Sequence, residues 1–304
     1  MNSETSNIGL RADPKFSNLI SQRFHANISP KIDAKFFMIE FYNDRSRDDD
    51  FFLFITQRLV NYALSKEERS QINDKNCQDI CKQAIRRYVT NSTKFRGGEM
   101  GDLILFHLLE VGEGAVQVIN KMCIKTSGGM HSHGSDAIHF GINGQLKFLF
   151  LGESKTGENF YSTLYEAVSS VNGYCLDKEE HQLEITLASG NISDDIPPDI
   201  RRMIKDYLDP FGAKKEDFSE IHAIFLCFEE KKLKEIEEKN NGEDLIEKIL
   251  AAYQEKIQDY ISKISTRINA HPELINRQFI FYLLPIKDLE RARKLFLGEL
   301  TNAH

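Results

Sequence analysis

Apolar residues recur along this chain at two spacings, and each spacing predicts a different element. Short apolar runs and strict alternation predict strands at residues 35–41, 183–188, 222–228 and 279–284. Apolar residues three and four positions apart predict helices at residues 51–64, 76–89, 99–111, 160–176, 244–269 and 287–300. Helices and strands alternate from about residue 136 onward. We therefore expect an α/β fold that is preceded by a helical N-terminal region.

A β-hairpin at residues 136–155 is the most clearly marked element of the pattern. Two apolar runs flank an Asn-Gly pair at residues 143–144, which is the strongest short-range signal for a two-residue hairpin turn. If this pair occupies both turn positions, Asp136 lies opposite Leu151. This register makes Asp136 and Glu153 diagonal neighbours, about 7 Å apart.

Side chains alternate between the two faces of a strand, so Glu153 and Lys155 are expected on one face, together with Asp136. Two carboxylates and an ammonium group would then converge at the open end of an apolar hairpin. Hard cations such as Mg²⁺ or Mn²⁺ bind through one or two carboxylates, water and substrate phosphate. The hairpin therefore predicts a metal site.

Two further features bear on this prediction. Glu99 begins a predicted helix after two glycines and is a candidate third acid, although a first-turn glutamate also simply favours the helix dipole. Other Glu-x-Lys triplets occur at residues 229–231, 230–232 and 237–239. They lie in a charge run without an acid folded back beside them, which is typical of a solvated surface.

Composition limits the class of protein. The chain of 304 residues is 41% hydrophobic and 28% charged, which is ordinary for a globular protein. Its net charge of −7 gives no overall basic footprint, so a nucleic-acid substrate would have to be supplied mostly by a partner. Five cysteines without a secretory signal or a membrane-length apolar run indicate reduced thiols and a cytoplasmic location.

The arrangement of these residues resembles the PD-(D/E)XK nuclease core, a mixed sheet flanked by helices. Asp136 begins the hairpin, residues 153–155 (Glu-Ser-Lys) end its second strand, Glu99 lies on a preceding helix and the helix at residues 160–176 follows. Ser135 stands where this core often has a proline before the aspartate.

A narrower resemblance rests on KMCIK at residues 121–125, HGSDAIH at residues 133–139 and GESK at residues 152–155. This string is similar to HamA, the nuclease subunit of the Hachiman antiphage defence system, which works with the helicase HamB. The resemblance implies metal-dependent DNA cleavage that is restrained until a superfamily 2 helicase partner engages phage or damaged DNA. It also implies Mg²⁺ or Mn²⁺ on Asp136 and Glu153, with Lys155 as the catalytic lysine and Glu99 as the helix acid.

Residues 1–94 are then expected to form an N-terminal, partly helical region suited to partner docking. Residues 95–304 would form the nuclease domain with a C-terminal extension. An alternative function is a nuclease-like fold retained as a non-catalytic adaptor on a helicase. His131 and His133 also suggest a zinc hydrolase cluster, but their spacing to Asp136 is one residue too long and no histidine follows it.

Overall fold

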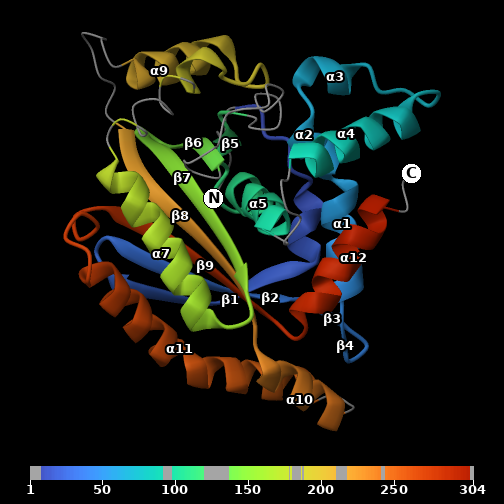
Figure 1. Cartoon of the computed structure of the whole chain (residues 1–304), viewed down its shortest axis with the longest axis vertical. Helices are drawn as coiled ribbons and strands as arrows, with labels where there is room; N and C mark the ends of the chain where they lie inside the picture. The colour runs from blue at the N-terminus through green and yellow to red at the C-terminus, as the bar shows by residue number, and fades with distance from the viewer. Residues whose placement is uncertain are drawn as a thin grey trace.

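The computed structural model describes residues 8–91, 98–119, 137–177, 179, 186, 188–209, 218–240 and 244–301. A seven-stranded mixed sheet has the order β1-β2-β9-β8-β7-β6-β5 (Figure 1). Its strands are β1 (Ile20–Ser29), β2 (Ile32–Ile39), β5 (Val116–Gln117), β6 (Ala137–Asn143), β7 (Leu146–Gly157), β8 (Phe218–Glu229) and β9 (Gln278–Ile286). The four central strands run parallel, whereas β1, β6 and β5 pair antiparallel at the edges. The α/β fold is confirmed.

Helices cover both faces of this sheet (Figure 1). One face carries α1 (Asp48–Gln57), α2 (Leu59–Ala63), α4 (Cys77–Asn91), α5 (Gly98–His107) and α12 (Leu289–Thr301). The other face carries α7 (Phe160–Leu176) and α11 (Leu245–Asn269), with α9 (Pro198–Leu208) over β5 and β6. No helix in the described ranges is both long and apolar enough to cross a membrane.

Shorter elements complete the chain. They are η1 (Pro14–Asn18), α3 (Lys66–Ser70), the hairpin of β3 (Phe41–Tyr42) and β4 (Arg45–Ser46), the π-helical turn η2 (Leu108–Gly112) and α10 (Lys231–Lys239). The π-helical turn directly continues α5, so the helix predicted at residues 99–111 changes its hydrogen-bonding pattern near its end.

Strand β8 shows why the centre of the sheet is buried on both sides. Ala223, Phe225 and Cys227 belong to the core beneath α5. Ile224, Leu226 and Phe228 alternate with them and belong to the core beneath α7 and α11. A strand covered by helices on both faces reads as a continuous apolar run, which is how β8 is recognisable in the sequence.

Most predicted elements are present, but several differ. The predicted helix at residues 51–64 is divided at Arg58 into α1 and α2. Of the predicted strand at residues 183–188, Thr186 and Ala188 are described and both are helical, so the strand prediction is wrong there. The sequence patterns also missed β1, α9 and α10.

The hairpin is present with a different register. Asn143 pairs with Leu146, so Gly144 and Gln145 form the turn, and Ile138 lies opposite Leu151. The predicted register was therefore wrong by two residues. Gly144 has a φ of +62° and Gln145 is not in the left-handed region, which is the pattern of a type II′ turn with glycine first.

The N-terminal region is not separate from the sheet. Strand β2 pairs in parallel with β9, and β1 pairs with β2, so residues 20–39 extend the sheet formed by the later part of the chain. The predicted boundary between residues 94 and 95 falls outside the described residues.

Candidate functional site

The predicted Glu-x-Lys pair lies on one face of β7. The Lys155 Nζ atom donates to the Glu153 Oε1 atom at 2.5 Å. The Glu153 side chain is 7% exposed and the Lys155 side chain 30% exposed, so the carboxylate is largely buried while the ammonium group reaches solvent. In the ladder with β8 these residues stand beside Ile224 and Leu226, which face α7 and α11. Glu153 and Lys155 therefore point to the α7 side of the sheet.

This pair lies next to the last described pairing of β7 with its antiparallel neighbour. The described pairing between β6 and β7 reaches Ala137 and Gly152, immediately before Glu153. On its other side, β7 pairs with β8 as far as Gly157. Glu153 and Lys155 therefore lie near the end of β7 that leads into α7.

Asp136, the predicted second carboxylate, lies outside the described residues. Its neighbour in the chain, Ala137, pairs with Gly152, which is the neighbour of Glu153. His131 and His133 also lie outside the described residues.

Glu99 lies in the first turn of α5, and α5 packs on the opposite face of β7. A Cβ atom added to Gly101 of α5 would lie 3.0 Å from the Ser154 hydroxyl, and Ser154 alternates with Glu153 and Lys155. The structure thus brings Glu153 and Lys155 together and puts Glu99 in the layer on the other face. The Glu99 Oε2 atom is buried and has no hydrogen-bond partner in the described part of the chain.

Sequence reasoning missed the contact that orients this segment of β7. The Ser154 hydroxyl donates to the carboxylate of Asp102 on α5. Arg293 of α12 donates to the main-chain oxygen of Thr156 at 3.4 Å. These contacts hold the even-numbered residues toward α5, so the alternating Glu153 and Lys155 are held toward α7. The signal in the sequence was an acid one position after Gly101 on an otherwise apolar helix.

A second buried carboxylate lies at the other end of α5. Glu110 accepts hydrogen bonds from the main-chain nitrogens of Arg11 at 2.5 Å, Ala12 at 2.6 Å and Gln117 at 3.2 Å. Its Oε1 atom is 3.8 Å from the Arg11 Nε atom, and both side chains are almost fully buried. Burial raises the pKa of Glu110, and these donors partly offset the rise.

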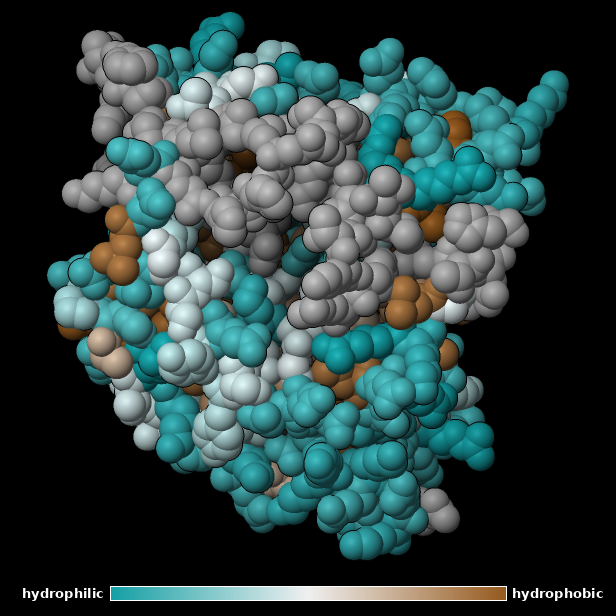
Figure 2. Space-filling model, viewed as in Figure 1, coloured by the Kyte–Doolittle hydropathy of each residue, from teal (hydrophilic) through white to brown (hydrophobic). Residues whose placement is uncertain are grey.

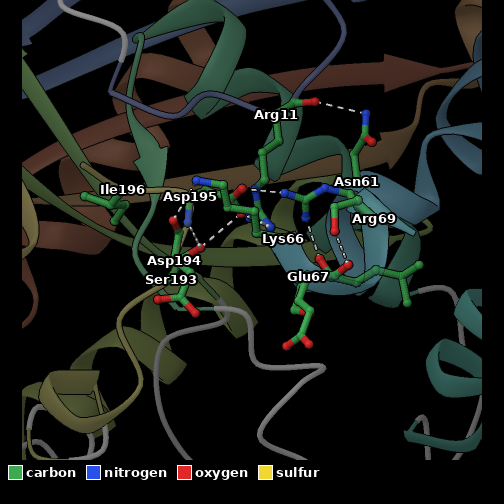
Figure 3. Close-up of polar contacts among 12 residues, drawn as sticks. Arg11, Asn61, Lys66, Glu67, Arg69, Ser193, Asp194, Asp195 and Ile196 are labelled. Carbon is green, nitrogen blue, oxygen red and sulfur yellow. Dashed lines mark hydrogen bonds and ion pairs between the residues drawn. The ribbon is translucent and has the colours of Figure 1, made fainter. Parts of the chain in front are cut away.

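Arg11 extends this network to two other segments (Figure 3). Its Nη1 atom is 3.6 Å from Asp195, which also pairs with Arg69 of α3 at 2.5 Å. The main-chain oxygen of Arg11 accepts a hydrogen bond from Asn61 at 2.9 Å. The N-terminal segment, α2, α3 and the segment before α9 are therefore joined through one arginine.

No three His, Cys, Asp or Glu side chains are grouped closely enough to hold a metal ion within the residues that the structure describes. Cys77 and Cys81, four residues apart on α4, are free thiols. A site with three such side chains at Glu153 would need a ligand from outside the described residues, where the predicted second acid, Asp136, lies.

Comparison with known proteins gives one result for the whole chain. The HamA family matches residues 14–300. No curated protein matches the sequence. Because the match covers nearly all of the chain, this protein belongs to the HamA family of antiphage (Hachiman) defence proteins.

Proposed function

We propose that this HamA-family protein is a metal-dependent DNA endonuclease and the effector of an antiphage defence complex with a superfamily 2 helicase. The observation that carries the proposal is the Glu153–Lys155 pair on one face of β7, next to the last described pairing with β6. A buried carboxylate can bind a divalent cation, and an ammonium group on the same face can stabilise negative charge on a scissile phosphate.

The residues present fit a hard divalent cation. Glu153 supplies a largely buried carboxylate oxygen, and Asp136 adjoins the residue that pairs with Gly152. Glu99 lies in the layer on the other face of β7, and its buried Oε2 atom has no hydrogen-bond partner within the described residues. We assign the metal, Mg²⁺ or Mn²⁺, to Asp136 and Glu153, with Glu99 as the helix acid that acts from the α5 side and does not share the ion with Glu153 directly.

The side chains divide the chemistry among them. A bound cation would lower the pKa of a coordinated water and offset negative charge on the scissile phosphate. Lys155, held by Glu153 but 30% exposed, would orient the attacking water and add positive charge beside the phosphate. Ser154 and Asp102 would act as positioning residues, because they fix which face of β7 the pair occupies.

The net charge of the chain supports the need for a partner. A protein that binds DNA by itself usually presents a basic surface, and this chain carries a net charge of −7. A helicase that holds the DNA would deliver a strand to Glu153 and Lys155 and would restrict cleavage to the DNA on which it acts.

The decisive test is plasmid nicking by the reconstituted complex with Mg²⁺. Glu153→Gln and Lys155→Met should each reduce the rate by more than about 100-fold, since each removes a group that acts on the phosphate or on the water. Asp136→Asn should have a similar effect, and Glu99→Gln about a tenfold effect.

A second Glu–Lys pair provides the control. Glu255 and Lys232 form an exposed ion pair at 2.9 Å between α10 and α11. Glu255→Gln and Lys232→Met should leave the rate unchanged. Undiminished cleavage by folded Glu153→Gln protein would refute the catalytic assignment and leave the non-catalytic adaptor as the better function.

A further inference from the structure

Helix α7 presents two tyrosines to solvent. Tyr161 is 51% exposed and Tyr165 is 58% exposed, whereas most large apolar and aromatic side chains of the described residues are buried. They are four residues apart, so they lie one above the other on the same side of the helix, about 6 Å apart along its axis. The space-filling view shows α7 as a pale ridge of weakly polar residues on an otherwise hydrophilic face (Figure 2).

Each tyrosine has a cation from the neighbouring helix over its ring. The Lys263 Nζ atom is 5.6 Å from the centre of the Tyr161 ring, and the Arg267 Cζ atom is 3.9 Å from the centre of the Tyr165 ring. Lys263 and Arg267 are also four residues apart, on α11. Two helices thus form an aromatic–cation ladder, defined by Tyr161, Tyr165, Lys263 and Arg267.

Other contacts hold this ladder in place. The Arg267 Nη2 atom donates to the Ser169 hydroxyl at 2.8 Å, which fixes the guanidinium plane against Tyr165. The Tyr161 hydroxyl donates to Asp259, so that ring is also held in one orientation. Rigid aromatic side chains lose little conformational entropy when a ligand stacks on them.

The ladder is beside the proposed nuclease site. Helix α7 begins three residues after Gly157, the end of β7, and its buried side packs on the same face of the sheet to which Glu153 and Lys155 point. Strand β7 and helix α7 lie next to each other in Figure 1. A chain bound along the exposed side of α7 would therefore run next to the end of β7 that carries Glu153 and Lys155.

We propose that the aromatic–cation ladder binds single-stranded nucleic acid and guides it to the proposed nuclease site, an inference that rests on the proposed function. Bases stack on exposed aromatic rings regardless of sequence, and lysine and arginine contact the phosphates between them. A duplex keeps its bases stacked inside, out of reach of tyrosine rings, so the aromatic residues select a single strand. Asp259, which accepts a hydrogen bond from Tyr161, and the exposed Glu166 beside Tyr165 place negative charge near the ladder, so stacking on the rings has to supply much of the affinity.

Binding is measured separately from cleavage, with the full chain, EDTA and a fluorescein-labelled oligothymidylate. Tyr161→Ala and Tyr165→Ala should each weaken binding by at least about fivefold, as expected for loss of one stacked base. Tyr165→Phe, which keeps the ring, should bind as the wild type does. Lys263→Ala and Arg267→Ala should each lower the slope of log affinity against log salt by about 0.7.

Two variants on a different surface are matched controls. Tyr42 is 70% exposed at the β3–β4 hairpin, and Lys294 is exposed on α12. Tyr42→Ala and Lys294→Ala should leave binding unchanged. Binding that is insensitive to both tyrosine substitutions, or that is lost equally with Tyr165→Phe or Tyr42→Ala, would overturn the ladder.

The assay also distinguishes failure of the ladder from failure of the nuclease proposal. Oligothymidylate binding that is unchanged by the tyrosine substitutions, together with Glu153-dependent cleavage, would overturn the ladder alone. If the tyrosine substitutions abolish binding of the helicase but leave oligothymidylate binding unchanged, the ladder is a protein-docking surface and the proposal is overturned. Ladder-dependent binding by a protein that does not cleave DNA would support the ladder and refute the nuclease.

Discussion

Glu110 and Glu153 are both nearly buried carboxylates with a basic partner, but their partners come from different distances along the chain. The donors to Glu110 include the main-chain nitrogens of Arg11 and Ala12, which are 99 and 98 residues away. A cation beside Glu153 is Lys155, two residues away on the same strand. The first carboxylate joins distant segments, whereas this ion pair of the second is local.

The two ion pairs are therefore expected to respond differently to substitution. Removing the cation from a buried pair that joins distant segments leaves an uncompensated buried charge, which is strongly destabilising. The pair of Glu153 and Lys155 needs little tertiary structure to form, because an extended strand already brings alternate side chains near each other. Buried ionisable groups in contact with a partly exposed charge are frequent at functional sites, so Glu153 is the candidate for chemistry.

The largest expected effect on stability comes from breaking the ion pair between Arg11 and Glu110. Arg11→Met leaves the Glu110 charge buried without its cation and should lower the free energy of unfolding by about 3–5 kcal/mol. Glu153→Gln should change it by less than about 1 kcal/mol, because Lys155 reaches solvent. Urea denaturation measures both. Lys232→Met, at an exposed pair with Glu255, is the control and should be nearly neutral. Equal losses for Arg11→Met and Glu153→Gln would contradict the comparison.

The region around Glu110 should also be the more sensitive to acid. Burial lowers the pKa of His107 to about 4, and burial lowers the pKa of His139 to about 3. Below pH 6.5 the unfolded chain binds protons that the folded protein does not. Stability is therefore complete above about pH 6.5 and falls as the pH falls toward 4. Between pH 7.5 and pH 5 each histidine should cost about 2 kcal/mol, or about 4 kcal/mol together.

Urea midpoints at several pH values check this prediction. His139→Leu should remove about half of the loss, since neither ring nitrogen of His139 has a hydrogen-bond partner among the described residues. The raised pKa of Glu110 acts in the opposite direction. The pKa of Glu68 is lowered to about 2, mainly by its hydrogen bond to Arg87, so its contribution is lost only below about pH 4.5. A pH dependence that is unchanged in His139→Leu would contradict the assignment.

The sequence predicted the pair of Glu153 and Lys155 but not the contacts between Glu110 and Arg11. Glu153 and Lys155 are related by the two-residue period of a strand, which any apolar run makes visible. Glu110 and Arg11 are related by the way in which the N-terminal segment crosses α5 and η2. No periodicity contains that information. For the same reason the sequence predicted a helix at Glu99 but not the face of the sheet that this helix covers.

The missed elements have specific physical causes. Strand β1 is an edge strand, and its Gln22, Arg23 and His25 hide the alternation of apolar residues. Helix α9 carries an apolar stripe of Ile200, Ile204 and Leu208. The pair of prolines at its start, residues 197–198, is instead typical of a turn when only the sequence is considered. Proline in the first turn of a helix is favourable, so Pro198 begins the helix instead of preventing it. By contrast, α7 has the predicted bounds because its apolar stripe follows an Asn159 N-cap.

Both β6 and α5 approach β7 closely at Gly152. Substituting this glycine should have a smaller effect on stability than Arg11→Met. A Cβ atom there would lie 2.9 Å from the Cβ atom of Ala137 and 3.0 Å from the Cδ2 atom of Leu105. Gly152→Ala must therefore separate β6 or α5 from β7, and should cost about 1–3 kcal/mol of stability. Nicking activity should fall as well, since Glu153 follows directly. Gly173→Ala on α7 meets no atom within 4 Å and should instead stabilise by about 0.5–1 kcal/mol. Equal effects of the two substitutions would contradict the close approach.

The smallest expected effect is stabilisation of the protein by Mn²⁺. It also distinguishes the proposed nuclease function from the alternative function as a non-catalytic adaptor. Carboxylates gathered on one face repel each other, so a cation that binds them should stabilise the folded protein. At a Mn²⁺ concentration ten times the dissociation constant, the gain is about 1.4 kcal/mol. A thermal melt should show this gain in the wild type and in Glu110→Gln, although the latter starts from a lower Tm. It should be absent in Glu153→Gln and Asp136→Asn, because these variants remove the oxygens to which we assign the ion. If Mn²⁺ stabilises the Glu153→Gln protein as much as the wild type, the ion binds elsewhere and Glu153 loses its distinction from Glu110.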